Sequence, residues 1–334
     1  MTSLQNRRHF LAGLTATGAT GLACSATPAR AEPPPETTTV RLALWSKLDC
    51  LTPIYISEPL LRAEGFTDIQ FVTEFRDPDW YNWLRAGDYD FEMNYPVNMV
   101  MHMANYPPVK VLAGMHAGCL ELIADRHIDS VKELKGKRVG ITQSNSSTHM
   151  LLVLMAANVG LDPDKDIEWV IAPSALEQLA EGKIDAFLSS PPEPQMARAR
   201  GIGHSILKTT LDRPWSQYFC CMLAGNADYV SRYPVATKRT LRALLKAVDI
   251  CRSDPTMAAR QSAGKGFAST YDFAVQTLSE ARYDTWREYD PEDSLRFYAL
   301  RMQETGIIDK NPNDIIADGT DWRFLNELKR EMKA

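Results

Sequence analysis

The sequence predicts an α/β fold in which a mostly parallel sheet carries helices on both faces. Between about residues 39 and 209, short apolar runs alternate with segments of helical periodicity. From about residue 233 onward, the strongly periodic segments are all helical. Such alternation is typical of strands joined by helical crossovers, and the terminal helices are expected to pack around one part of the molecule.

The expected strands are short runs that end in polar or turn-forming residues. They lie at 39–45, 69–75, 89–94, 109–115, 120–125, 138–142, 167–172, 184–190 and 204–209. The expected helices lie at 52–65, 79–87, 96–105, 130–136, 149–160, 175–182, 192–201, 234–254, 256–264, 272–284, 290–306 and 322–334. Proline in the first turn supports several helix starts, as at Thr52-Pro53 and Asp290-Pro291.

Residues 1–31 have the pattern of an export signal. Arg7-Arg8 is followed by Phe10-Leu11, then by a weakly apolar stretch that ends in Ala29-Arg30-Ala31. The arginine pair resembles a twin-arginine signal, and the small residues predict cleavage after Ala31. An ordinary secretory signal and a lipid anchor at Cys24 are the alternatives. Residues 32–39, "EPPPETTT", predict a flexible leader.

Charge and cysteine content argue against several classes of protein. The net charge of −5 becomes −8 once residues 1–31, with three arginines and no acid, are removed, which argues against nucleic acid or an anionic membrane as a partner. The five cysteines beyond the signal are odd in number and scattered: Cys50, Cys119, Cys220, Cys221 and Cys251. We therefore expect no disulfide framework, no metal site and no cofactor.

A run of small polar residues joins the strand at 138–142 to the helix at 149–160. Ser144, Asn145, Ser146, Ser147 and Thr148 offer more capping groups than one helix needs. Helix N-termini attract anions through free N–H groups and the helix dipole, so the last three residues are candidates to bind an oxyanion. The alternative is a capped helix without a ligand.

Three segments carry a resemblance to a known family. They are "SVKELKGKRVGITQSNSSTHMLLVLMAANVGLDPDKDIEWV", "ALEQLAEGKIDAFLSSPPEPQMARARG" and "WLRAGDYDFEMN". In this order they resemble the aliphatic-sulfonate, nitrate and taurine receptors of ABC importers, a group that includes thiamine-pyrimidine binders. The resemblance extends over about residues 40–310. Asn145 stands where the family has a turn glycine, and Asn tolerates left-handed backbone better than most residues.

The resemblance implies a two-lobe periplasmic-binding-protein fold of type II, with the ligand cleft between the lobes. Lobe one is expected at 38–124 and 225–334, and lobe two at 125–224. The implied function is that of a periplasmic receptor, not an enzyme, which delivers a small organic, anionic solute to an ABC permease with a separate ATPase subunit. By the same resemblance the receptor is a monomer.

Candidate ligand-binding residues follow from the strand ends and helix starts, where ligands of open α/β sheets bind. Aromatic side chains among them suggest a ligand with an apolar or aromatic body. The candidates are Trp45, Ser46, Glu92, Asn94, Tyr95, His116, Ser146, Ser147, Thr148, Ser190, Glu193, Trp215 and Tyr218.

Two other functions stay open at this point. One is an enzyme similar to the thiamine-pyrimidine synthases of the same fold, and the other is a periplasmic solute sensor or scaffold. The adjacent Cys220 and Cys221 could be redox-active, but neighbouring side chains of a strand point to opposite faces. We therefore expect them to diverge and to act as small buried hydrophobes.

Overall fold

The computed structural model describes residues 32–45, 47–74, 82–105 and 108–332. The predicted signal at 1–31, the candidate Ser46 and part of the expected helix at 79–87 lie outside these residues. Contacts divide the chain into a unit of residues 1–33 and a unit of residues 34–334. Every helix and strand within the described residues belongs to the second unit.

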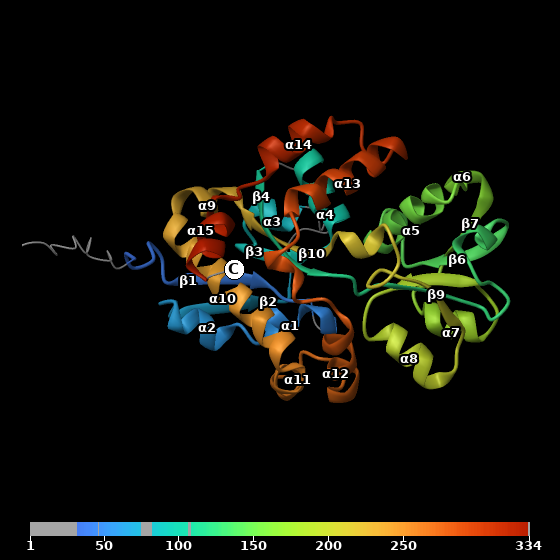
Figure 1. Cartoon of the computed structure of the whole chain (residues 1–334), viewed down its shortest axis with the longest axis horizontal. Coiled ribbons are helices and arrows are strands. Elements are labelled where there is room, and N and C mark those ends of the chain that lie inside the picture. Colours follow the sequence, from blue (N-terminus) through green and yellow to red (C-terminus); the bar gives the residue numbers. More distant parts are fainter. Residues whose placement is uncertain (1–31, 46, 75–81, 106–107, 333–334) are drawn as a thin grey trace, which may run out of the picture. The chain divides into compact units, whose positions relative to one another are not determined.

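Two five-stranded sheets organise this unit, each covered by helices (Figure 1). The first sheet has the order β2 (Asp68–Val72), β1 (Thr39–Ala43), β3 (Phe91–Asn94), β10 (Phe219–Asn226) and β4 (Val109–Ala117). The second has the order β7 (Ile167–Ile171), β6 (Lys137–Ile141), β8 (Ala186–Ser189), β5 (Glu121–Ala124) and β9 (His204–Lys208). The predicted two-lobe α/β architecture is confirmed.

In each sheet four strands run in the same direction, as the sequence predicted, but one strand runs against them, so both sheets are mixed. In the first sheet β1 pairs in parallel with β2 and β3, but β10 runs antiparallel between β3 and β4. In the second sheet β6 pairs in parallel with β7 and β8, and β5 runs antiparallel between β8 and β9. The chain reaches β5 from β4 of the first sheet, and it reaches β10 from β9 of the second sheet. Because each of these two strands follows a crossing between the sheets and not a helix that returns to the same sheet, each runs antiparallel to its neighbours.

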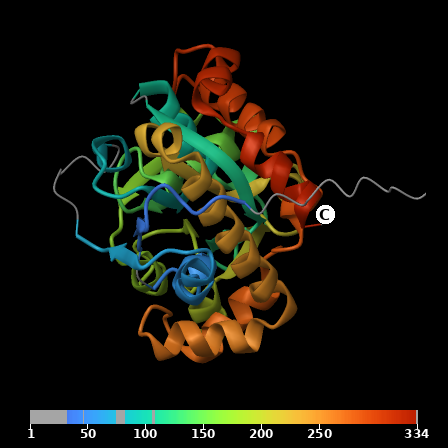
Figure 2. The ribbon, with the colours of Figure 1, turned by 90° about the vertical axis from the view of Figure 1, so that its left-hand side faces the viewer.

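The first lobe consists of the first sheet and the helices around it. These are α1 (Thr52–Tyr55), α2 (Glu58–Ala63), α3 (Trp83–Ala86), α4 (Pro96–Asn105), α9 (Ala227–Arg232), α10 (Pro234–Ser253), α11 (Pro255–Gly264), α12 (Tyr271–Glu280), α13 (Pro291–Glu304), α14 (Pro312–Gly319) and α15 (Arg323–Glu331). Figure 2 shows the long α10 running across this lobe, where it packs on α1, α2 and α15. The C-terminal helices thus surround one lobe, as expected.

The second lobe carries α5 (Ser147–Asn158), α6 (Pro163–Asp166), α7 (Ala175–Ala180) and α8 (Glu193–Arg200) around its sheet. Two helix predictions differ in detail from the structure. The segment 52–65 forms two short helices: α1 ends with Ile56 as its C-cap, and α2 begins after Ser57, its N-cap. Pro59 has no N–H to donate to the Tyr55 carbonyl, so one continuous helix would lose that hydrogen bond. The segment 130–136 forms a 3-10 turn at Val131–Leu134.

The chain crosses between the sheets at residues 118–120 and 209–218. Strand β5 belongs to the second sheet and β10 to the first, so the predicted lobe boundaries at 124/125 and 224/225 fall one strand too late. Sheet membership depends on hydrogen-bond partners far away in sequence, which local patterns do not reveal. The crossings run close together: Gly118 has φ +63°, and a Cβ there would lie 2.4 Å from Thr210 Cα. Only glycine fits this position without strain.

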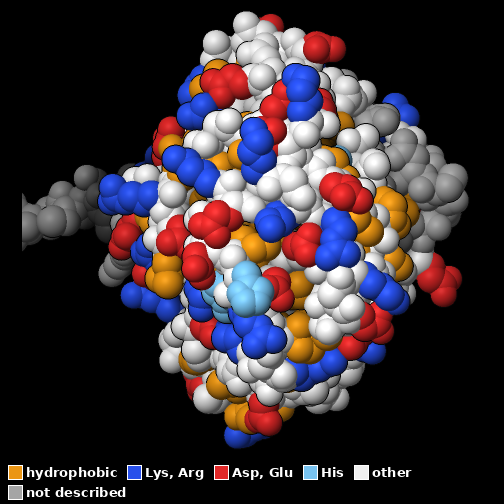
Figure 3. Space-filling model, turned by 90° about the vertical axis from the view of Figure 1, so that its right-hand side faces the viewer, with side chains coloured by type: hydrophobic (Ala, Val, Ile, Leu, Met, Phe, Trp, Pro, Cys, Tyr) orange, Lys and Arg blue, Asp and Glu red, His pale blue; other side chains and the backbone are white. Residues whose placement is uncertain are grey.

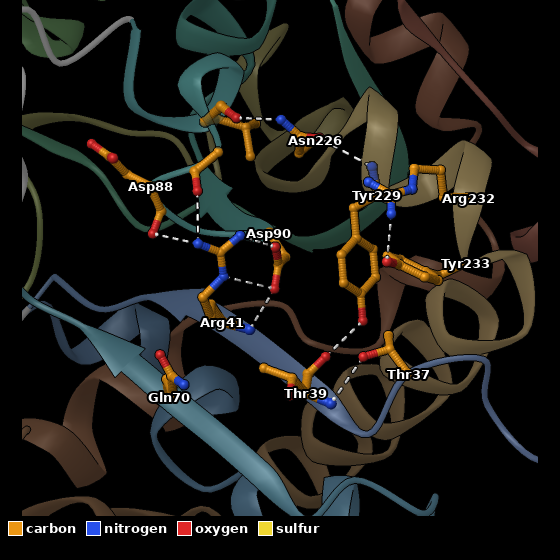
Figure 4. Close-up of polar contacts among 12 residues, drawn as sticks. Thr37, Thr39, Arg41, Gln70, Asp88, Asp90, Asn226, Tyr229, Arg232 and Tyr233 are labelled. Atoms are coloured by element: carbon orange, nitrogen blue, oxygen red, sulfur yellow. Dashed lines mark hydrogen bonds and ion pairs between the residues drawn. The ribbon is translucent and has the colours of Figure 1, made fainter.

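The lobes share a structural motif that explains part of the resemblance. In the first, the Asp90 carboxylate accepts from the backbone N–H of Arg41 at 2.8 Å and pairs with its guanidinium (Figure 4). In the second, Asp185 accepts from the N–H of Arg138 at 2.8 Å and pairs with its guanidinium at 2.7 Å. The pairs join β1 to the Gly-x-x-Asp segment before β3 and β6 to the Gly-x-x-Asp segment before β8.

The end of the predicted leader is bound to the first lobe. The Glu36 carboxylate accepts from the N–H groups of Val235 and Ala236 at 2.9 Å each, at the start of α10. Thr39 begins β1, and its carbonyl accepts from the Tyr229 hydroxyl at 3.1 Å (Figure 4). The leader is therefore anchored over its last four residues, because its acid meets the positive end of a helix.

The surface of the second lobe mixes both charges. On the face in Figure 3, Lys and Arg side chains alternate with Asp and Glu and gather into no large patch of one sign. Within the described ranges, none of the helices combines the length and apolar character needed to span a bilayer.

Candidate functional site

Two adjoining cavities lie between the lobes, beyond the carboxyl ends of β1, β3, β6 and β8. The larger has a volume of about 350 Å³. Its lining comes from both lobes: Trp45, Leu48, Cys50, Leu51, Trp83, Met93, Asn94, Tyr95, Asn98, Thr142, Gln143, Ser146, Ser147 and Cys221. The smaller, of about 260 Å³, shares Tyr95, Thr142, Ser146 and Ser147 with it. This is the strand-end position where α/β proteins bind ligands.

An aromatic pair forms one wall of the larger cavity. The rings of Trp45 and Trp83 are stacked, with centroids 5.6 Å apart and planes 28° from parallel. The loop that carries Trp45 is held by the buried Tyr55, whose hydroxyl donates to the Trp45 carbonyl and lies 3.0 Å from the Leu48 carbonyl. Because stacked indoles present a flat apolar face, this wall suits a planar or apolar part of a ligand.

The N-terminus of α5 forms the opposite wall. Ser146 is the N-cap and accepts from the His149 N–H at 3.3 Å. Asn145 has φ +61°, so the left-handed backbone expected at this position is confirmed. The first-turn N–H groups of a helix have no partner within it, and the dipole there favours negative charge. This wall therefore suits an oxyanion or a carbonyl-type acceptor.

A hydrogen-bonded link crosses the cleft beside the cavity. Asn98 of α4, in the first lobe, places Nδ2 2.7 Å from Ser147 Oγ of the second lobe, and that hydroxyl lies 3.0 Å from Asn98 Oδ1. Asn98 is buried and also donates to Asn94 Oδ1 at 2.6 Å. The structure thus has the lobes joined at the point where a ligand would enter between them.

The smaller cavity has a different polar character. Glu193, the first residue of α8, accepts from the hydroxyl of Ser189, and Ser190 lies beside them. In contrast, none of the described residues that line the larger cavity is an acid, a base or a histidine. A ligand group in the larger cavity is therefore met by dipoles and aromatic faces, and a donor group extending into the smaller one can reach a carboxylate.

Eight of the predicted site residues lie together around the two cavities. They are Trp45, Asn94, Tyr95, Ser146, Ser147, Thr148, Ser190 and Glu193. The reason is that strand ends and helix starts of an α/β sheet converge on one edge.

Four predicted residues lie elsewhere. Glu92 is buried inside the first lobe, where it accepts from the Tyr89 hydroxyl at 2.8 Å and lies 3.1 Å from His102 Nε2. Trp215 and Tyr218 pack on Phe297 of α13, Tyr218 stacking at a centroid distance of 4.0 Å. His116 is fully buried beneath the cavity. Glu92 lies two residues before the end of β3, where its side chain is covered by Tyr89 and by His102 of α4. The two aromatics follow the crossing onto α13.

Several lining residues were not predicted from the sequence. Apolar Leu48, Leu51 and Met93 gave no signal, because they resemble core residues. Asn98 was not predicted as a site residue, because it lies within the expected helix at 96–105. Its position in the first turn of a helix that directly follows a strand could have identified it. Thr142 ends a predicted strand and Gln143 directly follows it, so the strand-end rule could have found both.

The two adjacent cysteines do not diverge as expected. Cys220 Sγ lies 3.0 Å from Cys119 Sγ, and Cys221 Sγ also lies near that thiol. The pairing of β10 with β4 shifts register between Phe219 and Cys221, which makes Cys220 the extra residue of a β-bulge. A bulge interrupts strand alternation, so both side chains approach the same region. The predicted burial of both is confirmed.

Comparison with known proteins identifies related sequences. Residues 120–265 match the NMT1-like family. The bicarbonate-binding protein CmpA of Synechococcus elongatus is 32% identical over 127 residues, which make up 37% of this chain. The matched segment spans only 28% of the length of CmpA.

Solved structures share the fold at low sequence identity. The periplasmic nitrate-binding protein NrtA of Synechocystis has a TM-score of 0.75 at 15% identity, over 90% of each chain. The alkanesulfonate-binding protein SsuA of Xanthomonas axonopodis, bound to MOPS, has a TM-score of 0.68 at 15% identity, over 86% of this chain and 99% of its own. The desulfurization enzyme DSZB has a TM-score of 0.63 at 15% identity, over 87% and 99%. The fold is thus that of two-lobe binding proteins, and it also occurs in an enzyme.

Proposed function

Because residues 120–265 match the NMT1-like family and the chain has the two-lobe fold of periplasmic binding proteins, we propose that it is the solute receptor of an ABC importer. The observation that carries this proposal is the cavity between the lobes, with contacts from both sheets and one polar link across the cleft. Such a cavity suits a solute that is enclosed by closure of the lobes and released by their opening.

The proposed ligand is a small organic anion with a flat or apolar body. The body would lie against Trp45 and Trp83, and the anionic group at the N-terminus of α5. A volume of about 350 Å³ is at the lower end of the range for small-molecule sites. CmpA, NrtA and SsuA are named for binding bicarbonate, nitrate and alkanesulfonate, all of them anions. An aromatic wall favours a solute larger than the first two.

The mechanism is a shift between open and closed lobes. A ligand that contacts both lobes binds the closed form more tightly than the open form, and its binding energy therefore favours closure. The Asn98–Ser147 link gives the closed form a contact of its own. The closed receptor would then dock on a permease whose ATPase is a separate subunit.

We also propose that the protein is exported to the periplasm and cleaved after Ala31. The Arg7-Arg8 pair supports this, and NrtA is a periplasmic protein. A monomer fits the proposed docking on a permease, and the acidic net charge argues against nucleic acid as a partner. N-terminal sequencing of the exported protein tests the cleavage site.

A thermal-melt screen on the purified protein tests the proposed function. Carried-over ligand is removed by unfolding and refolding, and the panel holds alkyl and aryl sulfonates, taurine, nitrate, bicarbonate, aromatic carboxylates and pyrimidines. A ligand at 100 times its Kd stabilises the fold by about 2.7 kcal/mol, which raises Tm visibly. Stabilisation by one anionic class supports the proposal, and stabilisation by neutral pyrimidines alone contradicts the proposed ligand class.

The enzyme and sensor alternatives predict different results. An enzyme of this fold would convert its ligand, so mass spectrometry of the recovered ligand would show a product; an unchanged ligand supports a receptor. A sensor would bind the same solute without a permease. Uptake of the solute that is lost on deletion of the receptor gene and restored by its return supports transport.

A further inference from the structure

Four potential metal ligands gather beneath the larger cavity. The donor atoms of Cys50, His116, Cys119 and Cys221 all lie within 4.8 Å of one another. All four residues are buried, with exposed fractions of 1%, 0%, 6% and 1% respectively. Buried cysteines alone are common as small hydrophobes, so the thiols by themselves do not identify a site.

The histidine supplies the independent observation. His116 is completely buried; its ring interacts with the Cys50 thiol and the Gly118 backbone, but neither Nδ1 nor Nε2 makes a well-formed hydrogen bond to the described residues. The ring of Tyr283 packs beside it at a centroid distance of 4.9 Å. A buried imidazole without a well-formed hydrogen bond is unfavourable, and its position among three thiols therefore favours a bound ion that it can ligate.

The backbone brings these ligands together from three rigid segments. Cys221 of β10 lies directly opposite His116 of β4, so the two side chains are cross-strand neighbours on one face. Cys119 follows the left-handed Gly118, and its N–H is fixed by Thr209 Oγ1 at 3.1 Å. Cys50 lies on the turn Asp49–Leu51, where its carbonyl accepts from the Tyr283 hydroxyl at 2.8 Å.

We propose that Cys50, His116, Cys119 and Cys221 bind one Zn²⁺ ion. Three thiolates and one imidazole are a common tetrahedral zinc set, with Zn–S bonds of about 2.3 Å and Zn–N bonds of about 2.0–2.1 Å. Such bonds place the donors roughly 3.5–3.8 Å apart, so a present spread of up to 4.8 Å requires only a small contraction of the side chains.

The charge balance also favours zinc. Zn²⁺ replaces the three thiol protons, so a neutral group becomes one with a single negative charge. A monovalent soft ion such as Cu⁺ in the same set would leave two negative charges in a buried site. Zinc therefore carries the smaller desolvation penalty.

The larger cavity offers the ion a route to the site. Cys50 and Cys221 line both the cavity and the cysteine–histidine group, so the zinc would lie directly beneath the solute. The zinc proposal does not depend on the proposed function, because occupancy of the metal site is measured without any solute. It differs from the expectation, drawn from sequence spacing, that no metal is bound.

Cys220 stands beside the proposed ligands. Its thiol, 3.0 Å from Cys119 Sγ, can donate to the Cys119 thiolate as an outer hydrogen-bond partner of the metal site. The competing chemistry is a disulfide between Cys119 and Cys220, in which an external thiol oxidant takes up two hydrogens. That product would remove one zinc ligand.

Zinc content of the reduced full chain tests the proposal. The chain is refolded with one equivalent of zinc under a thiol-free reductant, desalted and analysed for metal, and X-ray absorption reports the ligands. We expect one zinc per chain with three sulfurs and one nitrogen. Cys50→Ser and Cys221→Ser should lose stoichiometric zinc. The matched control is Cys251→Ser, a buried free cysteine of α10 outside the group.

Cobalt keeps the test valid if the variants fail to fold. Co²⁺ added to the reduced native chain should give intense thiolate-to-metal charge-transfer absorption and the visible bands of a tetrahedral site. No zinc uptake and no such spectrum overturn the proposal. So does zinc uptake that Cys50→Ser and Cys221→Ser leave unchanged, or a chain that takes up Cu⁺ but not Zn²⁺. Mass spectrometry shows a disulfide as a loss of two hydrogens. A chain isolated with such a disulfide that still binds no zinc after the disulfide is reduced also overturns the proposal.

Discussion

At the scale of single residues, the stacked indoles decide what the larger cavity can hold. Trp45 and Trp83 come from different segments and are half-buried, so each still offers a face to a ligand. The two indoles contribute to the free energy of ligand binding through buried contact area. An aromatic ligand stacked on them in the preferred geometry of aromatic pairs gains about 0.5–1.5 kcal/mol more than burial alone provides.

Trp83→Ala should therefore weaken ligand binding by about tenfold while the protein stays folded. Calorimetric titration with the ligand found in the melt screen measures this effect. The matched control is Trp322→Ala, which removes a half-buried Trp that donates to Glu292 Oε2 at 3.1 Å outside both cavities. Equal affinity loss in the two variants would contradict the role of the aromatic wall.

The two Arg–Asp pairs have the same geometry but opposite pKa shifts. In the second lobe, hydrogen bonds from Arg138 lower the pKa of Asp185. In the first lobe, burial raises the pKa of Asp90 in spite of Arg41. Stabilisation by Asp185 is therefore complete above its unfolded pKa of about 3.9 and is lost as pH falls through the lower folded value. Asp90 has the opposite sign, so its ionised form is disfavoured in the fold and stability rises as pH falls through its folded pKa.

Asp185→Asn should thus cost about 1–3 kcal/mol at pH 7, and the difference from the wild type should shrink below about pH 4. For Asp90→Asn the difference from the wild type should grow as pH falls through the raised folded pKa of Asp90 towards about pH 4, and should stay constant below that. Urea unfolding at several pH values measures both. If the stability of the two variants relative to the wild type changed with pH in the same way, the greater burial of Asp90 would have no effect on its titration.

At the scale of elements, the pairing of β4 with β10 leaves no room at its centre. A Cβ at Gly114 would lie 2.3 Å from the ring of Phe219, which is fully buried in the next strand. Because the pair also carries His116 and Cys221, its register positions the proposed metal site as well.

Gly114→Ala should destabilise the fold by at least about 1–3 kcal/mol through overpacking. Gly264→Ala is the matched control, because Gly264 ends α11 and a Cβ there would meet open space. This substitution should leave the stability unchanged or raise it by up to about 1 kcal/mol. Thermal and urea unfolding give both values. A neutral Gly114→Ala would mean that Phe219 can move aside.

The N-cap of α5 serves both folding and binding in our proposal. Ser146 accepts from the His149 N–H, and Thr270 caps α12 in the same way by accepting from the Phe273 N–H at 3.2 Å. Ser146→Ala and Thr270→Ala should each cost about 0.5–2 kcal/mol of stability. Only Ser146→Ala should also lower the affinity for an anionic ligand, as measured by titration. Unchanged affinity in Ser146→Ala would place the anion elsewhere.

At the scale of the whole unit, residues 34–334, polar contacts between described residues join the lobes at two places, beside the cavity and between α8 and α12, where Gln195 also donates to Glu280 at 2.9 Å. Asn98 and Ser147 meet beside the cavity, and Arg198 of α8 pairs with Glu280 of α12 at 2.8 Å. The crossings at 118–120 and 209–218 are the remaining connections along the chain. The balance of open and closed forms therefore depends on few contacts.

Breaking the Asn98–Ser147 link should open the lobes of the ligand-free protein. Asn98→Ala, Ser147→Ala and the double variant form a cycle, with an expected coupling of about 0.5–1.5 kcal/mol. Small-angle scattering should show a larger radius of gyration for each variant without ligand. A coupling of zero would mean that the two side chains do not hold the lobes together.

The sequence by itself determined the α/β class, most elements and the edge of the sheets where ligands gather. Local periodicity and capping residues carry this information, which is why Trp45, Asn94, Tyr95, Ser146 and Glu193 could be named in advance. The register of β10, the lobe boundaries and the convergence of Cys119, Cys220 and Cys221 were decided only by the tertiary structure. A bulge and a strand that changes sheets leave no local pattern, because both depend on partners about one hundred residues away.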